Sequence, residues 1–211
     1  MAKVIVALSM SLDGYIAGAN DGAEQPLGEG GMRLFDWYFE GDTPIRRYEE
    51  AGARGVPVPP FRLSRPSAEV FEELAESGGA AVTGRRTYDI AGAWGGNGPL
   101  PGIPTFVVTH HVPDRVPRGE SVYTFVTDGV ESAVAQARAV AGDGYVSLMG
   151  SAVPRECLRL GLLDEIQIHL VPVLLGGGVR LFDHLGGSVQ LELVRVVDAP
   201  GVTHLRYRVV R

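Results

Sequence analysis

Two segments of the sequence place a glycine and polar side chains directly after an apolar run. They are AVTGRRTYD, residues 81–89, and SLMGSAVPRE, residues 147–156. Both patterns predict a strand that ends at a glycine and leads into a helix, whose free N–H groups and dipole favour an anion. The first segment adds Arg85 and Arg86, planar donors that suit phosphate oxygens. The pair of segments therefore predicts a site for a dinucleotide or another phosphorylated ligand.

Common signatures of other sites are missing. No GxGxxG follows the first apolar run and no GxxxxGK[ST] occurs in the chain, so an ordinary Rossmann or P-loop site is not expected. No serine lies in a GxSxG elbow, and hydrolase chemistry therefore has little support.

The acid in SMSLDGYIAG, residues 9–18, has two interpretations. Asp13 follows the apolar run 4–8, where a strand would end at the mouth of a site. A carboxyl group at that place can supply or relay a proton during catalysis. Alternatively, Asp13 and Gly14 form a tight turn in which the carboxylate accepts hydrogen bonds from nearby backbone N–H groups.

Two further segments carry candidate ligand contacts. VVTHH, residues 107–111, ends a predicted strand with two imidazoles, of which only one can face a given site because neighbouring strand residues point to opposite faces. A polar contact to a cofactor phosphate is expected there rather than a metal site, because the remaining histidines are scattered: His169, His184 and His204. LLGGGVRLFD, residues 174–183, is either a phosphate-binding loop or a wide turn with a bulge.

The elements that must position these residues alternate along the chain. Three segments have a helical period: 68–77, 130–141 and 154–160, with Asp128 and Glu131 spaced as a capping box. About eight β-branched runs predict strands over 3–8, 80–83, 104–109, 122–126, 145–148, 165–172, 191–197 and 203–210. The alternation predicts an α/β fold with a mostly parallel sheet, and the turn DAPGV predicts a final antiparallel hairpin.

The totals are those of an ordinary globular protein. The 211 residues, 45% of them hydrophobic, suit a single domain over 1–211. A net charge of −6 argues against nucleic-acid binding. No apolar run is long enough for a membrane span or a signal peptide, so a cytoplasmic protein is expected. The one cysteine, Cys157, excludes an intrachain disulfide and is expected to be buried.

One stretch, 20–60, does not follow the alternation. It is rich in Gly, Pro and charge, although 32–39 has the pattern of a short amphipathic helix. A connection of this length inside a compact domain is usually functional, and either a lid or an oligomer contact is expected.

Read in order, six segments resemble the dihydrofolate reductase-like family: VALSMSLDGYIAG, VTGRRTYD, PTFVVTHH, MGSA, GLLDEIQIHLVPVLLGGGVRLFD and THLRYRVVR. This family includes the C-terminal reductase domain of the bifunctional deaminase-reductase of riboflavin biosynthesis, a 5-amino-6-(5-phosphoribosylamino)uracil reductase. The resemblance covers the chain apart from 20–60. It implies a three-layer αβα fold with a mixed eight-stranded sheet, NADPH as the cofactor, a small heterocyclic or sugar-linked substrate, and a homodimer.

The resemblance also implies roles for individual residues. The nicotinamide would lie against the end of the first strand, near Ser9, Ser11, Ile16 and Ala17. The pyrophosphate and 2′-phosphate turn matches Gly84, Arg85, Arg86 and Thr87. The positions that flank the adenosine phosphate match Thr109 and His110. The diphosphate loop matches Gly150, Ser151 and Ala152.

The sequence departs from the family where the substrate is handled. The riboflavin enzymes carry a lysine where this chain has Ala7, and an acid where it has Leu148 or Met149. The first glycine of the family's paired glycines also falls on Met149. Folate reductases use a carboxylate on the helix after the first strand, for which the candidates are Glu69, Glu72 and Glu73, all expected to be solvated.

The expected activity is therefore an NADPH-dependent reduction of a small molecule, with Asp13 as the candidate acid. Three aromatic residues offer stacking surfaces for a planar ring: Trp37, Tyr88 and Trp94. Two other classes stay open, a non-catalytic NADPH- or ligand-binding protein and an oligomeric scaffold whose glycine-rich turns are structural.

Overall fold

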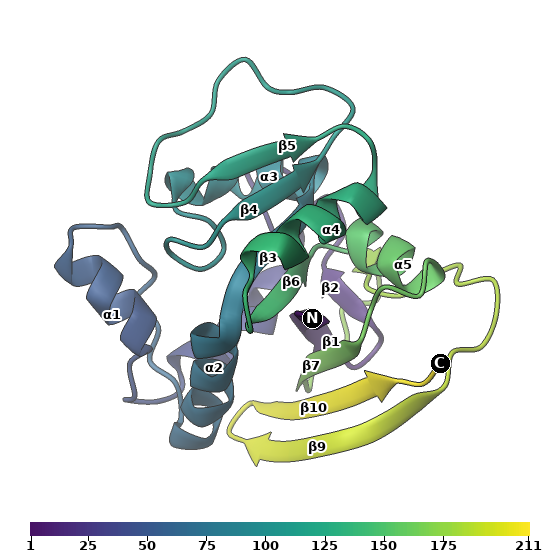
Figure 1. Ribbon diagram of the computed structural model, residues 1–211. Helices are drawn as coiled ribbons and strands as arrows, with labels where there is room; N and C mark the ends of the chain where they lie inside the picture. Colours follow the sequence, from purple (N-terminus) through teal and green to yellow (C-terminus); the bar gives the residue numbers. More distant parts are fainter.

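A computed structural model describes residues 1–211 (Figure 1) and contains one sheet of eight strands. The order across the sheet is β5-β4-β3-β6-β1-β7-β10-β9. The bounds of these strands are β1 Val4–Ser11, β3 Gly78–Gly84, β4 Thr105–Val108, β5 Tyr123–Val126, β6 Tyr145–Met149, β7 Glu165–Val171, β9 Leu191–Ala199 and β10 Val202–Val209. All pairs are parallel except β7 with β10 and β10 with β9. The predicted α/β fold, its eight strands and its C-terminal hairpin are confirmed.

Helices cover both faces of the sheet. On one face α4 (Val130–Val140) and α5 (Ala152–Arg159) pack on β3 and β6, and their apolar side chains form the main core with Val82 and Leu148 of these strands. On the other face lie α2 (Arg65–Ser77) and α3 (Arg85–Ile90). The core includes the thiol of Cys157, whose pKa burial raises to about 12, so its expected burial is confirmed. No helix is both long and apolar enough to cross a membrane.

The segment 20–60 folds against the α2 face. It contains the 3-10 helix η1 (Gly31–Phe39), as the amphipathic pattern predicted, and a short helix α1 (Arg46–Ala53), which the sequence did not predict. Trp37 and Leu34 of η1 are fully buried in a second core cluster that includes Val171 at the end of β7, and the Trp37 ring also packs against His169 of the same strand. This part of the segment is therefore anchored to the sheet.

Three local features differ from expectation. The pair β2 (Tyr15–Ala17) and β8 (Val179–Arg180) forms a second small sheet, too short to leave a periodic signal. The five-residue 3-10 helix η2 (Gly92–Gly96) follows α3 and was not predicted. The predicted capping box is wrong. The N-cap of α4 is Gly129, with a φ of 104°, and no side chain makes a capping hydrogen bond there.

Strand alternation decides which β1 side chains reach the α2 face. Val4 and Val6 point into the main core under α4 and α5. Ser9 lies on the opposite face, where the indole N–H of Trp37 donates to its hydroxyl oxygen at 3.1 Å. The end of β1 therefore carries apolar and polar side chains to the same edge of the sheet.

At the opposite end of the sheet, a network of ion pairs around the buried Glu165 links β7 to β10 and to the start of the chain. Glu165 on β7 is 7% exposed in its side chain and accepts from Lys3 Nζ at 2.6 Å and from Arg206 Nε at 2.8 Å. Arg206 also donates to Tyr145 Oη at 2.6 Å and pairs with Glu73. Burial opposes ionisation of Glu165, but the bonds from Lys3 and Arg206 outweigh it and lower its pKa.

This network makes a pH-dependent contribution to stability. We expect Glu165→Gln to lower the free energy of unfolding at pH 7 by about 2 to 3 kcal/mol, because charged hydrogen bonds are lost. A carboxyl group whose pKa is lowered on folding stabilises the fold above its unfolded pKa of about 4.3, and the contribution disappears as the pH falls further. The difference between wild type and variant, measured by urea unfolding from pH 7 to pH 3, should therefore shrink below about pH 4.

The matched control is Glu69→Gln. Glu69 pairs with Arg65 on the surface, where both side chains are more than half exposed, so its loss should have little effect. A Glu165→Gln deficit of the same size at pH 3 and pH 7 would show that the charge of Glu165 does not stabilise the fold.

Candidate functional site

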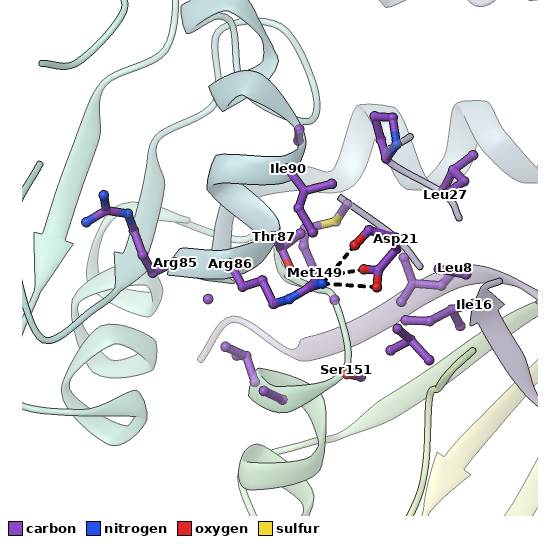
Figure 2. Close-up of a pocket in the computed structure, with 18 of the residues that line it drawn as sticks. Leu8, Ile16, Asp21, Leu27, Arg85, Arg86, Thr87, Ile90, Met149 and Ser151 are labelled. Carbon is purple, nitrogen blue, oxygen red and sulfur yellow. Dashed lines mark hydrogen bonds and ion pairs between the residues drawn. The ribbon is translucent and has the colours of Figure 1, made fainter. Parts of the chain in front are cut away.

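A cavity of about 790 Å³ lies at the carboxyl ends of β1, β3 and β6 (Figure 2). Most of its lining comes from five parts of the chain: the end of β1 with β2, the segment 20–60, α3 with the glycine before it, the stretch after α3, and the turn from β6 into α5. Single valines of β4, α4 and β8 complete it: Val108, Val130 and Val179. Ten of the predicted cofactor-binding residues line it: Ser9, Ile16, Ala17, Gly84, Arg85, Arg86, Thr87, Gly150, Ser151 and Ala152.

The two glycine turns meet because β6 pairs in parallel with both β3 and β1. α3 starts directly after Gly84, and α5 starts after Ser151. Gly150 between them has a φ of 75°, and a Cβ there would run into the hydroxyl of Thr87, so only glycine fits. Neither helix start has a capping side chain. Their first N–H groups are therefore available to an anion.

The turn tolerates the departure at Met149. Met149 is the last residue of β6, lines the cavity, and is not among the residues with positive φ. Of the two glycines that the family has in this turn, this chain keeps only Gly150, the one whose backbone conformation requires glycine.

Both arginines of the first turn are held by carboxylates. Arg86 makes a two-pronged ion pair with Asp21 of the segment 20–60, with Nη1–Oδ2 at 2.5 Å and Nη2–Oδ1 at 3.0 Å, across the cavity in Figure 2. Arg85 pairs with Asp89 one helical turn later, at 2.8 Å, and donates to the carbonyl oxygen of His111. An anionic ligand would therefore share or replace these partners.

A second cavity of about 300 Å³ adjoins the first, and Arg85 lines both. Thr109 and His110, the predicted contacts near the adenosine phosphate, line this second cavity. So does His111, which contradicts the expectation that only one histidine can face a site. The reason is that β4 ends at Val108, and the strand alternation ends with it.

The wall opposite the arginines is apolar. Ile16 and Ala17 of β2 form it with Leu8, Leu27 and, from η1, Phe35. Ser9 contributes the one hydroxyl of β1 that lines the cavity, and the N–H of Trp37 occupies an acceptor position of its oxygen. The same hydroxyl forms a side-chain hydrogen bond with Tyr38, so a ligand would compete with Tyr38 for its proton.

Of the three candidate stacking residues, Trp94 alone lines the cavity. Trp37 and Tyr88 are buried in the protein interior, 1% and 4% exposed. Trp94 is half-buried and lies in η2 with a left-handed backbone, φ 48°, next to Ala93 with φ 50°. This conformation costs roughly 1 to 2 kcal/mol for each non-glycine residue. The hydroxyl of Tyr123 binds the carbonyl oxygen of Ala93 and the N–H of Gly98, which helps to hold it.

The structure places Ser11 and Asp13 outside both cavities. Ser11 Oγ donates to Asp13 Oδ1 at 2.6 Å, and the Asp13 carboxylate also accepts from the N–H groups of Leu175 and Gly176 at 3.1 and 2.7 Å. The Ser11 bond first, then these backbone bonds, lower the pKa of Asp13 to about 2. The N–H groups of the glycine-rich loop 174–178 therefore bind the Asp13 carboxylate of the protein itself. This geometry favours the turn interpretation over the proton donor.

The candidate substrate carboxylates on α2 also lie outside the cavity. Glu73 pairs with Arg206 and Arg195, and Glu69 with Arg65. Glu72 accepts from the N–H of Arg46 at the start of α1. All three glutamates were expected to be solvated, but Glu72 connects α2 to α1 and Glu73 connects α2 to β9 and β10.

Sequence reasoning missed one polar cluster. His169 and His204 face each other across β7 and β10, with their Nδ1 atoms 2.7 Å apart, and Ser67 Oγ lies 3.0 Å from His204 Nε2. The two residues were described as scattered because they are 35 positions apart. Burial lowers both pKa values, so the pair is neutral at pH 7.

The comparisons with known proteins agree with this architecture. The model of the RibD C-terminal domain family matches residues 2–205. An uncharacterised Bacillus subtilis protein, YwjB, is 23% identical over 194 residues, covering 90% of this chain and 88% of that protein. A Shewanella sp. PV-4 structure, assigned provisionally to riboflavin biosynthesis, is 26% identical with a TM-score of 0.66, and the match covers 100% of both chains.

A more distant likeness shows the fold alone. Dihydrofolate reductase from Enterococcus faecalis, solved with NADP(H), is 16% identical with a TM-score of 0.54. That match covers 99% of this chain and 97% of the reductase.

The role of Asp13 can be tested with Asp13→Asn. We expect the melting temperature to fall at pH 7, because the charge that holds Leu175 and Gly176 is lost. Since the folded pKa is about 2, the stabilising effect is complete above about pH 5 and disappears as the pH falls from about 4 towards 2. Thermal unfolding over this pH range, beside the exposed control Asp143→Asn, measures it. An unchanged melting temperature together with lost turnover would instead support the proton donor.

Proposed function

The chain belongs to the RibD C-terminal domain family, a family of reductase type, and on that premise we propose that it is a cytoplasmic, NADPH-dependent reductase of a small molecule. The observation that carries the proposal is the polarity of the cavity. Two arginines and an uncapped glycine turn lie at one end, and a nearly apolar wall with one hydroxyl lies at the other. The single buried cysteine suits a reducing compartment.

The residues present fit such a cofactor. Arg86, Thr87 and the turn at Gly150 would hold the diphosphate, because their donors converge where a Cβ at Gly150 would not fit. Arg85, which lines both cavities, would bind the 2′-phosphate together with Thr109 and His110. Ser9 would donate to the carboxamide, and Ile16 and Ala17 would pack on the ring and exclude water.

When bound, NADPH supplies a hydride from its nicotinamide. The protein would orient the nicotinamide towards the substrate and exclude water from it with its apolar wall. The two carboxylates that line the cavity, Asp21 and Glu156, are paired with Arg86 and Arg159. Arg159 holds the pKa of Glu156 below its usual range, so Glu156 is not a proton donor at pH 7. We therefore propose that the proton for the product comes from water.

A second candidate function is a non-catalytic NADPH-binding protein. It is favoured by the loss of a substrate-binding charge. Where the riboflavin enzymes carry a lysine, this chain has Ala7, a half-buried residue that pairs with Gln167 of β7. Oxidation of bound NADPH by any compound from a panel of pterins, flavins, quinones and pyrimidines would exclude it.

The cofactor proposal is tested by titration with NADPH and NADH. We expect tighter binding of NADPH, because it alone carries the 2′-phosphate. Arg85→Ala should weaken NADPH binding by about 10- to 100-fold, equivalent to one or two charged hydrogen bonds, and leave NADH binding nearly unchanged. Arg86→Ala should weaken the binding of both cofactors, since the diphosphate is common to them.

Asp21→Asn is the matched opposite variant. It removes the carboxylate that competes for Arg86, so the affinity for both cofactors should rise. Equal affinity of the wild type for NADPH and NADH would refute the assignment of Arg85.

We also propose that the protein is a homodimer that packs through β9. This edge strand exposes Leu191, Leu193 and Val196 at 40%, 54% and 51%, and Figure 1 shows β9 at the margin of the sheet. These residues pair with the β10 residues Val209, Tyr207 and Leu205, which extend the main core. Strand alternation puts the ion pair Glu192–Arg208 on the opposite face of the hairpin, so the patch itself is apolar. A second copy that presents the same apolar patch therefore fits it.

Leu193→Glu tests this interface. A charge in the centre of the patch should convert the dimer into a monomer, because a buried unpaired carboxylate is costly. Sedimentation equilibrium at several concentrations measures the mass. Val122→Glu, an exposed apolar position before the opposite edge strand β5, should leave the dimer intact. A monomeric wild type would contradict the proposal.

A further inference from the structure

The cavity is divided into a charged end and an apolar end. Figure 2 shows Arg85 far from Leu8, Ile16 and Leu27, with the Arg86–Asp21 pair between them. The apolar end is continued by Phe35 of η1 and by Ile90 of α3. A cofactor whose phosphates take the arginine end and whose nicotinamide packs on Ile16 and Ala17 leaves the rest of the apolar surface to the second reactant: Leu27, Phe35 and Ile90.

The charged side chains of the cavity are already compensated. Four ionisable residues line it, and each one has a partner of opposite charge: Asp21 with Arg86, Arg85 with Asp89, and Glu156 with Arg159. At the apolar end the polar side chain is the Ser9 hydroxyl. A phosphate or carboxylate on the second reactant would therefore lose water there without meeting a cation.

Trp94 gives the cavity a flat aromatic surface, next to the residues Tyr88 and Val107 of a third core cluster. Its indole lines the cavity while the backbone from Gly92 to Gly96 stays in the left-handed region. Strained backbone that is held by surrounding contacts, here by Tyr123, is typical of functional sites. The aromatic face suits a planar ring or conjugated system.

We propose that the substrate is an uncharged, planar, conjugated carbonyl compound, of the class of quinones and α,β-unsaturated ketones. This inference rests on the proposed reductase function and narrows its substrate. For a quinone, the substrate gains a hydride, hence two electrons, and water supplies a proton to the oxygen that does not receive the hydride. The products are the hydroquinone, NADP⁺ and the hydroxide that water leaves. The phosphorylated sugar amine of the riboflavin enzymes does not match this end of the cavity.

The test uses two rings of the same size that differ in charge. The probes are 2-methyl-1,4-naphthoquinone and 1,4-naphthoquinone-2-sulfonate, with ribose 5-phosphate as the phosphorylated sugar. Calorimetry on the NADP⁺-saturated protein measures binding without turnover, and NADPH oxidation is followed separately. We expect the neutral quinone to bind at least about tenfold more tightly than the sulfonate, because a buried charge has no partner. Ribose 5-phosphate should not bind to this complex.

Two pairs of variants locate the ligand. Leu27→Arg should reverse the preference between the two quinones, whereas Leu27→Met should preserve it. Trp94→Ala should weaken binding of the neutral quinone several-fold, and Trp94→Phe, which keeps an aromatic ring, should weaken it less.

The outcomes separate this inference from the proposed function. If NADP⁺ and NADPH do not bind, the reductase proposal fails. If NADPH binds but the sulfonate or ribose 5-phosphate binds as tightly as the neutral quinone, the substrate class is wrong and the reductase proposal stands. Tight binding of the neutral quinone that neither Leu27→Arg nor Trp94→Ala changes would also refute the site.

Discussion

The arrangement of the site depends on one pairing constraint, the parallel insertion of β6 between β1 and β3. β3 and β6 are far apart in the sequence, but they are neighbours in the sheet. Their register places Thr83 beside Met149, and each of these residues directly precedes the glycine that ends its strand. The turns at Gly84 and Gly150 therefore leave the sheet at the same level and in the same direction. The close approach of Gly150 to Thr87 then joins them into one wall. A cavity at a carboxyl edge follows from this geometry, as is general for parallel sheets.

The same physical interaction serves two purposes in this fold. Backbone N–H groups in glycine-rich turns bind negative charge wherever they converge. After β7, at Leu175 and Gly176, the anion is the protein's own Asp13, and the bond ties that loop to the end of β1. At Gly84 and Gly150 no side chain caps the turns. The first arrangement is structural and the second is open to a ligand, although the two look alike as sequence.

Predictability followed the range of the interactions. The eight strands and the helices α2, α4 and α5 were found because their apolar periods are long enough to be read locally. The pair β2–β8 was missed because strands of two and three residues carry no period. Helix α1 was missed because its eight residues bury only Ala51, so they show no apolar stripe. The capping box failed for a related reason. Gly129, with φ 104°, takes the N-cap position that the spacing had assigned to Asp128.

For the site, the sequence by itself determined the chemical inventory and its order: two glycine turns, a pair of arginines and a serine-rich strand end. These are properties of neighbouring residues, which a local pattern contains. The tertiary structure alone decided which of them meet. It paired Arg86 with Asp21 from another segment, buried Trp37 while leaving Trp94 at the cavity, and joined His169 to His204. Such contacts depend on strand order and register, because these bring together side chains that are distant in the sequence.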